Sequence, residues 1–298
     1  MIRLAHYSDI HVTVPPLGQS ITALAGKRVM GTLNYYLGGR RSHFAQVETR
    51  IGTLLADIDA VGVDHALCTG DVTQMSYAIE FERLSALYGP RLQQPERHTV
   101  IPGNHDRYTH DATGERRFER ALGALAPERY PWLKALSPEV ELICLDVARP
   151  NTLLDSSGLI DEAQLQALVE LLRSPERRGH FVIVALHYGF FRKGGRPDNP
   201  VHGIRNWREL LSVLVDPAHP VDLILHGHIH GAFEFMVSGR RVINAGSATD
   251  LAHQPGYNIY EIDPAAKTVG VQRRSFEGES YRPGELLHVP EISFVPGS

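Results

Sequence analysis

The stretch most informative about the fold is Val100-Ile101-Pro102-Gly103-Asn104-His105-Asp106. Its apolar residues indicate a buried strand, and the proline and glycine indicate that the strand ends in a tight turn. The turn then presents an amide, an imidazole and a carboxylate at the C-terminal edge of a sheet, where open α/β sheets bind ligands. Taken alone, such a turn is equally typical of an ordinary chain reversal, so the rest of the chain must decide.

Short apolar segments that end in polar residues recur along the chain, and they alternate with segments of helical periodicity. The predicted strands are 2–8, 64–69, 99–101, 140–146, 180–186 and 221–225. The predicted helices begin near Ser42 and cover Ser76–Tyr88, Asp161–Arg173 and Trp207–Leu214. This alternation predicts parallel βαβ units. The segments 233–237, 240–244, 257–262 and 268–273 alternate apolar and polar residues, which predicts an antiparallel meander continuing a second sheet.

Three insertions interrupt the alternation, at about 12–41, 107–138 and 189–206. The first is too long for an ordinary connection and is expected to form a small helical lid around Leu24–Leu37. The second is expected to contain one helix, Glu115–Leu125, and the third is rich in glycine and proline and reads as a loop. No repeat or linker divides the chain, so residues 1–298 are expected to form one domain.

Composition narrows the class of protein. The apolar fraction of 43% and charged fraction of 21% are ordinary for a globular chain. The net charge of −4 does not favour binding to nucleic acid or to anionic membranes. No apolar run approaches the ~20 residues that span a bilayer. No charged and apolar leader segment is seen before the first predicted strand. Cys68 and Cys144 lie in apolar runs, and this placement predicts buried thiols in a reducing compartment. We therefore expect a cytoplasmic protein with no membrane partner; its oligomeric state stays open.

Five predicted strand exits carry side chains that bind metals or move protons. In sequence order they are Asp9 with His11, Asp71, Asn104 with His105 and Asp106, His187, and His228 with His230. Residues two apart on an extended backbone face the same way, so Asp9 and His11 are expected to point together. Carboxylate, imidazole and amide ligands suit Mn²⁺, Fe or Zn²⁺ better than Ca²⁺ or a thiolate-seeking metal. The pattern therefore predicts a transition-metal site at the sheet edge.

The order D-x-H, G-D, G-N-H-D, H and G-H-x-H resembles that of the calcineurin-like metallophosphoesterase superfamily, from residue 2 to about 250. The resemblance implies an α/β fold, a four-layer α/β/β/α sandwich, with two divalent or transition metal ions, Mn, Fe or Zn, and a metal-bridging hydroxide. One metal would be held by Asp9, His11 and His230, and the other by Asn104, His187 and His228. Asp71 would bridge the two ions.

Departures from branches of this superfamily narrow the activity. Gln74 stands where purple acid phosphatases have a tyrosine, and the stretch Gly70-Asp71-Val72-Thr73-Gln74-Met75 lacks the arginine of protein Ser/Thr phosphatases. The chain has no room for the large second domain of bacterial 5′-nucleotidases. The stretch Asn34-Tyr35-Tyr36-Leu37-Gly38-Gly39-Arg40-Arg41-Ser42-His43 resembles a bacterial branch close to cyclic-nucleotide phosphodiesterases.

These features favour a phosphodiesterase acting on a small-molecule phosphoester, with nucleotides as one candidate class. A phosphomonoesterase or a nuclease on the same scaffold is the alternative, although the acidic net charge disfavours a nucleic-acid partner. A non-catalytic scaffold is disfavoured because no ligand is missing.

Four residues are expected to act on the substrate. Asn104 and His105 would contact it, and His105 would serve as general acid or stabilise the transition state. Asp106 either orients His105 or anchors the turn. Arg205, in the third insertion, either places its planar fork on a phosphate oxygen or caps the helix that begins at Trp207.

Overall fold

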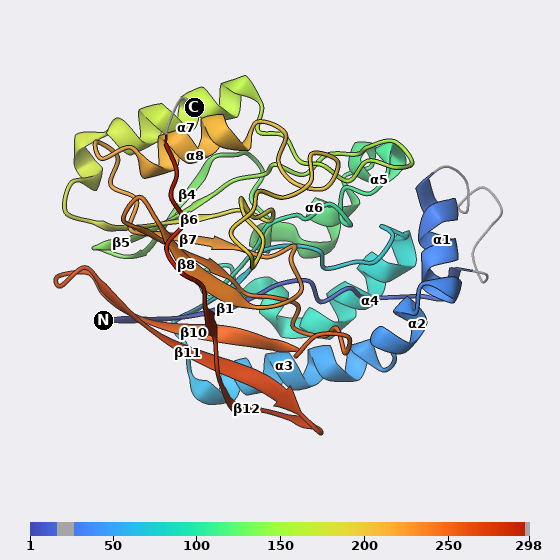
Figure 1. Cartoon of the computed structure of the whole chain (residues 1–298). Helices are drawn as coiled ribbons and strands as arrows, with labels where there is room; N and C mark the ends of the chain where they lie inside the picture. Colours follow the sequence, from blue (N-terminus) through green and yellow to red (C-terminus); the bar gives the residue numbers. More distant parts are fainter. Residues whose placement is uncertain (17–26, 296–298) are drawn as a thin grey trace.

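The computed structural model describes residues 1–16 and 27–295, and within them two β-sheets stack face to face (Figure 1). The first sheet has the order β12-β11-β10-β1-β2-β3, with β1 Ile2–Tyr7, β2 His65–Cys68, β3 His98–Val100, β10 Gly256–Asp263, β11 Thr268–Glu277 and β12 Ser280–Gly284. The second has the order β13-β8-β9-β7-β6-β5-β4, with β4 Trp132–Ser137, β5 Val140–Cys144, β6 Phe181–Ala185, β7 Leu223–His226, β8 Phe233–Val237, β9 Arg240–Asn244 and β13 Leu287–His288.

Strand side chains alternate between two apolar cores. Leu142 of β5 and Ile183 of β6 point into the core between the sheets, whereas their neighbours Ile143 and Val184 point to the outer face of the second sheet. Both faces of these strands are therefore buried. This explains why their sequences are continuous apolar runs without a polar alternation.

Helices cover the outer face of each sheet (Figure 1). The helices α3 Val47–Val61, α4 Ala78–Tyr88 and α6 Arg117–Leu122 pack on the first sheet, and α5 His110–Gly114 precedes α6. The helices α7 Glu162–Arg173 and α8 Trp207–Val215 pack on the second sheet. Short 3₁₀ turns complete the described helices, at η3 Gly89–Gln93, η4 Gly123–Leu125 and η5 Pro175–Arg177. The predicted four-layer α/β/β/α sandwich is confirmed.

The first insertion carries α1 Lys27–Leu37 and α2 Arg40–His43. The guanidinium of Arg28 holds α1 in place by donating to the carbonyls of Met75, at 3.0 Å, and Ser76, at 3.1 Å. Tyr35 of α1 is buried in an aromatic cluster beside them. The predicted helix around Leu24–Leu37 is thus present over Lys27–Leu37, and residues 24–26 of the prediction lie outside the described residues.

The predicted topology was wrong in three places. The strands β10 to β12 do not continue the second sheet: β10 pairs antiparallel with β1, with Ile2 opposite Ile262. The strand β9 joins β7 in parallel, so the meander is interrupted. Alternation shows that a segment is a strand, but it carries no information about which sheet edge the segment reaches. The edge strand β4 was missed altogether because its half-exposed residues, Lys134 and Ser137 among them, give a weak apolar signal.

Cys68 and Cys144 are buried free thiols, as the sequence predicts. Among the helices of residues 1–16 and 27–295, none combines the length and the apolar composition needed to cross a membrane.

Two strand exits of the first sheet approach each other backbone to backbone. Gly70 follows β2 with a φ of +101°, and a Cβ added there would lie 2.6 Å from the amide nitrogen of Gly103, which follows β3. A Cβ added at Gly103 would lie 2.2 Å from Oδ1 of Asp71. Only glycine permits this approach, and the approach sets the position of Asp71.

We predict that Gly103→Ala lowers the free energy of unfolding by about 1–3 kcal/mol, because the added methyl group would lie 2.2 Å from Oδ1 and 2.5 Å from the amide nitrogen of Asp71 and must displace them. Gly52→Ala in α3 is the matched control, since a Cβ at Gly52 meets nothing within 4 Å. There, alanine should stabilise the helix by roughly 0.5–1 kcal/mol. Chemical denaturation of both variants measures the difference, and equal stability for the two would contradict the tight contact.

Candidate metal centre

All seven predicted metal ligands meet at one edge of the sandwich, in the loops that follow β1, β2, β3, β6 and β7. The chain bends sharply there: Asp9, His11, Asp71 and His228 have φ values of 53°, 45°, 54° and 68°. Asp9 and His11 do point together, as expected, with Oδ1 of Asp9 3.8 Å from Nε2 of His11, but the extended backbone assumed between them is wrong. Each such residue costs about 1–3 kcal/mol, a cost that is accepted where a site requires the geometry.

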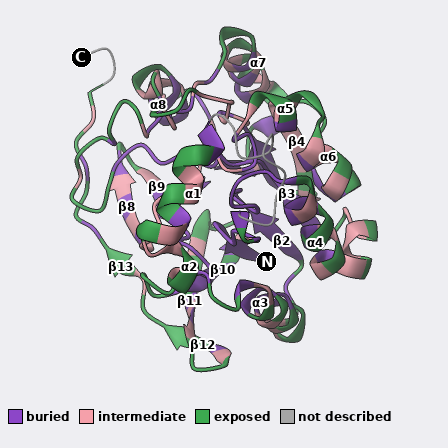
Figure 2. Cartoon of the chain, turned by 90° about the vertical axis from the view of Figure 1, so that its right-hand side faces the viewer, coloured by how far each residue is buried: buried purple, intermediate pink, exposed green. Residues whose placement is uncertain are grey.

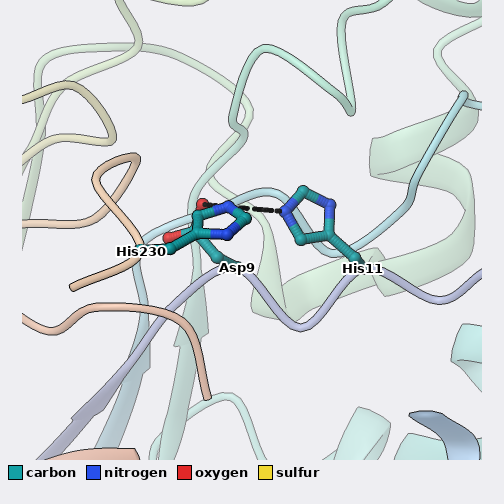
Figure 3. A group of neighbouring side chains, drawn as sticks. All are labelled: Asp9, His11 and His230. Carbon is teal, nitrogen blue, oxygen red and sulfur yellow. Dashed lines mark hydrogen bonds and ion pairs between the residues drawn. The ribbon is translucent and has the colours of Figure 1, made fainter. Parts of the chain in front are cut away.

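Asp9, His11 and His230 form the first cluster (Figure 3). Oδ1 of Asp9 lies 3.8 Å from Nε2 of His11 and 3.6 Å from Nε2 of His230. The two Nε2 atoms are 3.3 Å apart. Two loops that are more than 200 residues apart in sequence therefore place three donor atoms around one point.

Asp71, His187 and His228 form the second cluster, and Asn104 joins it with Oδ1 at 3.2 Å from Nε2 of His187. Oδ2 of Asp71 lies 3.4 Å from Nε2 of His187. The same oxygen lies 3.9 Å from Nε2 of His11, which belongs to the first cluster. One carboxylate oxygen thus stands between both clusters.

The imidazole rings are held so that one nitrogen of each faces the clusters. Nδ1 of His187 contacts the carbonyl of Thr69 at 2.7 Å, and Nδ1 of His11 contacts the carbonyl of Thr73 at 3.2 Å. Because a carbonyl can only accept, each ring carries a proton on Nδ1, and in its neutral form it keeps Nε2 as a lone-pair donor for a cation. In His228 it is Nε2 that is engaged, because it donates to the carbonyl of His202 at 3.1 Å, so Nδ1 is the nitrogen left for the cluster.

The electrostatics of the clusters fit bound cations. Burial raises the pKa of Asp9, and its Oδ1 is buried without a hydrogen-bond partner among the described residues. Burial also raises the pKa of Asp71, but the neighbouring imidazoles, His187 foremost, more than offset this and hold it well below its usual range. Burial lowers the pKa of His187, and the Asp71 carboxylate outweighs that effect and raises it to about 9. Buried carboxylates and converging imidazole nitrogens are donors that metal ions satisfy.

Asp106 anchors the turn and does not touch the ring of His105. Its carboxylate accepts from the amides of Gly103 and Thr73, both at 2.9 Å, and from the amide of Val72 at 3.2 Å. It therefore ties the loop after β3 to the loop after β2. Of the two roles expected from the sequence, these contacts favour the anchor.

The ring of His105 is fixed by other neighbours. Its Nδ1 contacts the carbonyl of Gln74 at 2.5 Å, and its ring stacks on Tyr108 with centroids 5.3 Å apart. Its backbone amide donates to Oδ1 of Asp71 at 2.7 Å. Burial lowers the pKa of His105 to about 4. The ring thus keeps Nδ1 on Gln74 and has Nε2 free for a group in the cavity.

A cavity of about 380 Å³ opens over the clusters. Asn104, His105 and Tyr108 line it beside the metal ligands, and Arg40 and Arg192 supply its cationic groups. The Nη1 atom of Arg40 is buried and has no hydrogen-bond partner among the described residues. Arg192 differs because its Nε donates to Asp198 at 2.6 Å.

Arg205 is not among the residues that line this cavity. Its Nε donates to Oγ of Ser157 at 2.9 Å, and its Nη2 forms an ion pair with Asp155. The neighbouring Ser156 lines the cavity, so Arg205 supports a wall segment from behind. The helix that begins at Trp207 has no side-chain cap bond from its N-cap residue, Asn206.

Sequence reasoning missed the carboxylates that orient two of the histidines. Oδ2 of Asp250 contacts Nδ1 of His230 at 2.5 Å, and Oδ2 of Asp198 contacts Nδ1 of His202 at 2.8 Å. Asp250 follows β9, so the strand-exit rule used for the other ligands could have found it. Asp198 and His202 lie in an irregular loop whose spacing carries no such signal.

Comparison with solved structures supports the fold. A dimetal phosphatase from Danio rerio is 14% identical, with a TM-score of 0.62 over 95% of this chain and 98% of that one. A purple acid phosphatase from yellow lupin is 9% identical, with a TM-score of 0.54 over 97% of this chain and 54% of that one. A putative 5′-nucleotidase from Staphylococcus aureus is 14% identical, with a TM-score of 0.51 over 96% and 54%. The chain thus spans about half the length of the last two.

A search of curated proteins with this sequence found no significant match. The family model described as calcineurin-like phosphoesterase, however, matches residues 2–232, which include all seven predicted ligands. With the D-x-H, G-D, G-N-H-D, H and G-H-x-H residues brought to one sheet edge, this match shows that the chain belongs to the calcineurin-like phosphoesterase family.

Proposed function

We propose that the protein is a two-metal phosphodiesterase acting on a small phosphoester. One observation carries the proposal: Oδ2 of Asp71 stands 3.9 Å from Nε2 of His11 and 3.4 Å from Nε2 of His187, within reach of both donor clusters. A carboxylate placed in this way can serve two cations at once. Paired cations ~3.5–4 Å apart suit in-line displacement at phosphorus.

In this proposal Asp9, His11 and His230 hold one ion, and Asn104, His187 and His228 hold the other, with Asp71 shared. When bound, the two ions would acidify a water molecule and neutralise charge on the phosphoryl oxygens. The protein's own part is to fix the donors. Asp250 orients His230, His202 orients His228, and Asp106 keeps the loops of Asn104 and Asp71 in register.

Two side chains would act on the substrate itself. Nε2 of His105 has no hydrogen-bond partner among the described residues, and the ring lines the cavity. Because burial holds its pKa at about 4, the ring would donate only as the imidazolium, a form that the negative charge of a bound phosphoester favours; in that form it would protonate the leaving oxygen or stabilise charge on it. The buried Nη1 of Arg40, which has no hydrogen-bond partner among the described residues, would bind a phosphoryl oxygen, since an Arg–phosphate pair satisfies such a donor. Arg205 remains a proposed substrate contact from the sequence, but its ion pair with Asp155 supports a positioning role.

Diester preference rests on the resemblance of residues 34–43 to the cyclic-nucleotide phosphodiesterase branch. A hydrolysis panel tests it: metal-reconstituted protein is assayed on bis-p-nitrophenyl phosphate, p-nitrophenyl phosphate, cyclic nucleotides and short DNA. A higher kcat/KM for the diesters is expected. A clear preference for p-nitrophenyl phosphate would replace the diesterase with a phosphomonoesterase, and a preference for DNA would indicate a nuclease.

Metal content is the most direct consequence. Elemental analysis of protein purified without chelator should find close to two transition-metal ions per chain, because two donor clusters are present. Asp71→Asn should lower the content more than the loss of any other ligand, since one carboxylate serves both ions. Asp59→Asn, whose carboxylate pairs with Arg91 far from the ligands, is the control and should keep the full content. Protein that takes up neither Mn²⁺ nor Zn²⁺ would refute the proposal.

His105→Ala should lower kcat by roughly 10²–10⁴ and leave metal content near wild type, because His105 touches the substrate but holds no ion. The loss should shrink for good leaving groups such as p-nitrophenolate, which need little protonation. His110→Ala on the exposed surface of α5 is the control. A loss that is equal for good and poor leaving groups would reassign His105 from proton donor to charge stabilisation.

Arg40→Gln should raise KM by about 10- to 100-fold, the value of a charge-assisted hydrogen bond to phosphate. The rise should be larger for a dianionic monoester than for a monoanionic diester, and Arg40→Lys should restore binding only in part. Arg41→Gln is the control, since Arg41 is adjacent and exposed.

Arg205→Ala should raise KM less than Arg40→Gln does, because the guanidinium of Arg205 is already paired with Asp155. A larger rise in KM for Arg205→Ala than for Arg40→Gln would contradict this expectation.

A further inference from the structure

Exposed large aliphatic side chains gather at the mouth of the cavity. Eleven large apolar residues are exposed among the described residues, and four of them lie on α1: Val29, Met30, Leu33 and Leu37. Val29, Leu33 and Leu37 are spaced at i, i+4 and i+8, so they form one stripe along the helix. Leu37 is 82% exposed. A single exposed apolar side chain is normal, but a contiguous group of them marks an interaction surface.

Four more of the eleven lie on segments beside α1: Leu153, Leu154, Val201 and Leu251. Contacts join these segments into a rim. Nζ of Lys27 donates to the carbonyl of Asp155 at 2.7 Å, the amide of Ser156 donates to Val201 at 2.8 Å, and the amide of Leu251 donates to His43 at 3.2 Å. The cavity lies inside this rim, since residues of α1 and of the loops at 156, 202 and 253 line it. Figure 2 faces this side, with α1 and α2 in front and much of their surface exposed.

The rim is also strongly basic. The segments 27–43, 149–157, 189–206 and 250–254 contain nine lysines and arginines against three aspartates, a formal charge of +6, although the whole chain carries −4. All three aspartates are engaged: Asp155 by Arg205, Asp198 by Arg192 and His202, and Asp250 by His230 and His253. Arg41, Lys193 and Arg196 stand exposed. Positive charge and exposed aliphatic groups thus share one face.

We propose that this rim docks on an anionic lipid surface, with the cavity mouth facing the phosphate headgroups. An amphipathic helix beside lysines and arginines binds such surfaces because aliphatic groups enter the headgroup boundary while cations pair with anionic lipids. Nucleic acid is the other polyanion to consider, but single strands are held by stacked aromatic rings, and none of the eight exposed large apolar residues of the rim is aromatic. The docking itself does not depend on hydrolysis. That it would present lipid phosphoesters to the site rests on the proposed function.

Vesicle co-sedimentation of the full chain tests the docking. Wild type should bind vesicles of equimolar phosphatidylcholine and phosphatidylglycerol, bind phosphatidylcholine vesicles at least about tenfold more weakly, and lose affinity as salt rises. Leu37→Glu with Leu154→Glu should reduce binding to the anionic vesicles at least about tenfold. Leu287→Glu with Val295→Glu adds the same charge away from the rim and should bind like wild type.

Hydrolysis of soluble bis-p-nitrophenyl phosphate, measured on the same samples, separates the docking from the chemistry. Both double variants should keep wild-type kcat/KM on this substrate. Wild type that does not sediment with the anionic vesicles overturns the docking, whatever its activity. Equal losses in the two double variants also overturn it, since the effect would then come from net charge. Binding to a short oligonucleotide in place of vesicles, or a dimer that Leu37→Glu with Leu154→Glu dissociates, would assign the rim to another partner and overturn the proposal.

Discussion

The position of the Asp71 carboxylate is the constraint on which the rest of the site depends. Its Oδ2 faces His11 on one side and His187 on the other, and its Oδ1 accepts from the amide of His105. Such a placement requires the loops after β2 and β3 to lie in backbone contact, which the Gly70–Gly103 approach permits. Asp106 then closes the contact with hydrogen bonds from one loop to the other. A small shift in either loop would move the one oxygen shared by the two clusters.

Packing of the scaffold offsets the unfavourable free energy of this arrangement. Left-handed conformations at Asp9, His11, Asp71 and His228 and buried carboxylates are each unfavourable, and they persist because the two sheets and their three apolar cores hold the strand ends in place. Backbone carbonyls and the carboxylates of Asp250 and Asp198 then set the rings, directly or through His202. The fold thus supplies rigidity, and the loops supply donors.

Much of this could be predicted because strand exits are visible in sequence: an apolar run followed by Asp, His or Asn marks both the element and its edge. The convergence of Asp9 with His230, and the order of strands within the sheets, depend on long-range packing that no local pattern encodes. Asp250 also follows a predicted strand, so the same pattern could have identified it. Arg40 lies in an insertion, where no strand end marks it. Whole-chain net charge is a further limit: a total of −4 is compatible with a basic rim at the cavity mouth, and no average over the chain could have predicted that rim.

The measurement that tests the shared role of Asp71 most directly is anomalous diffraction from crystals of Mn²⁺-loaded protein. The account predicts two anomalous peaks per chain, about 3.5–4 Å apart. One should lie among Asp9, His11 and His230, the other among Asn104, His187 and His228, with Asp71 contacting both. A single peak, or two peaks of which only one touches Asp71, would contradict it.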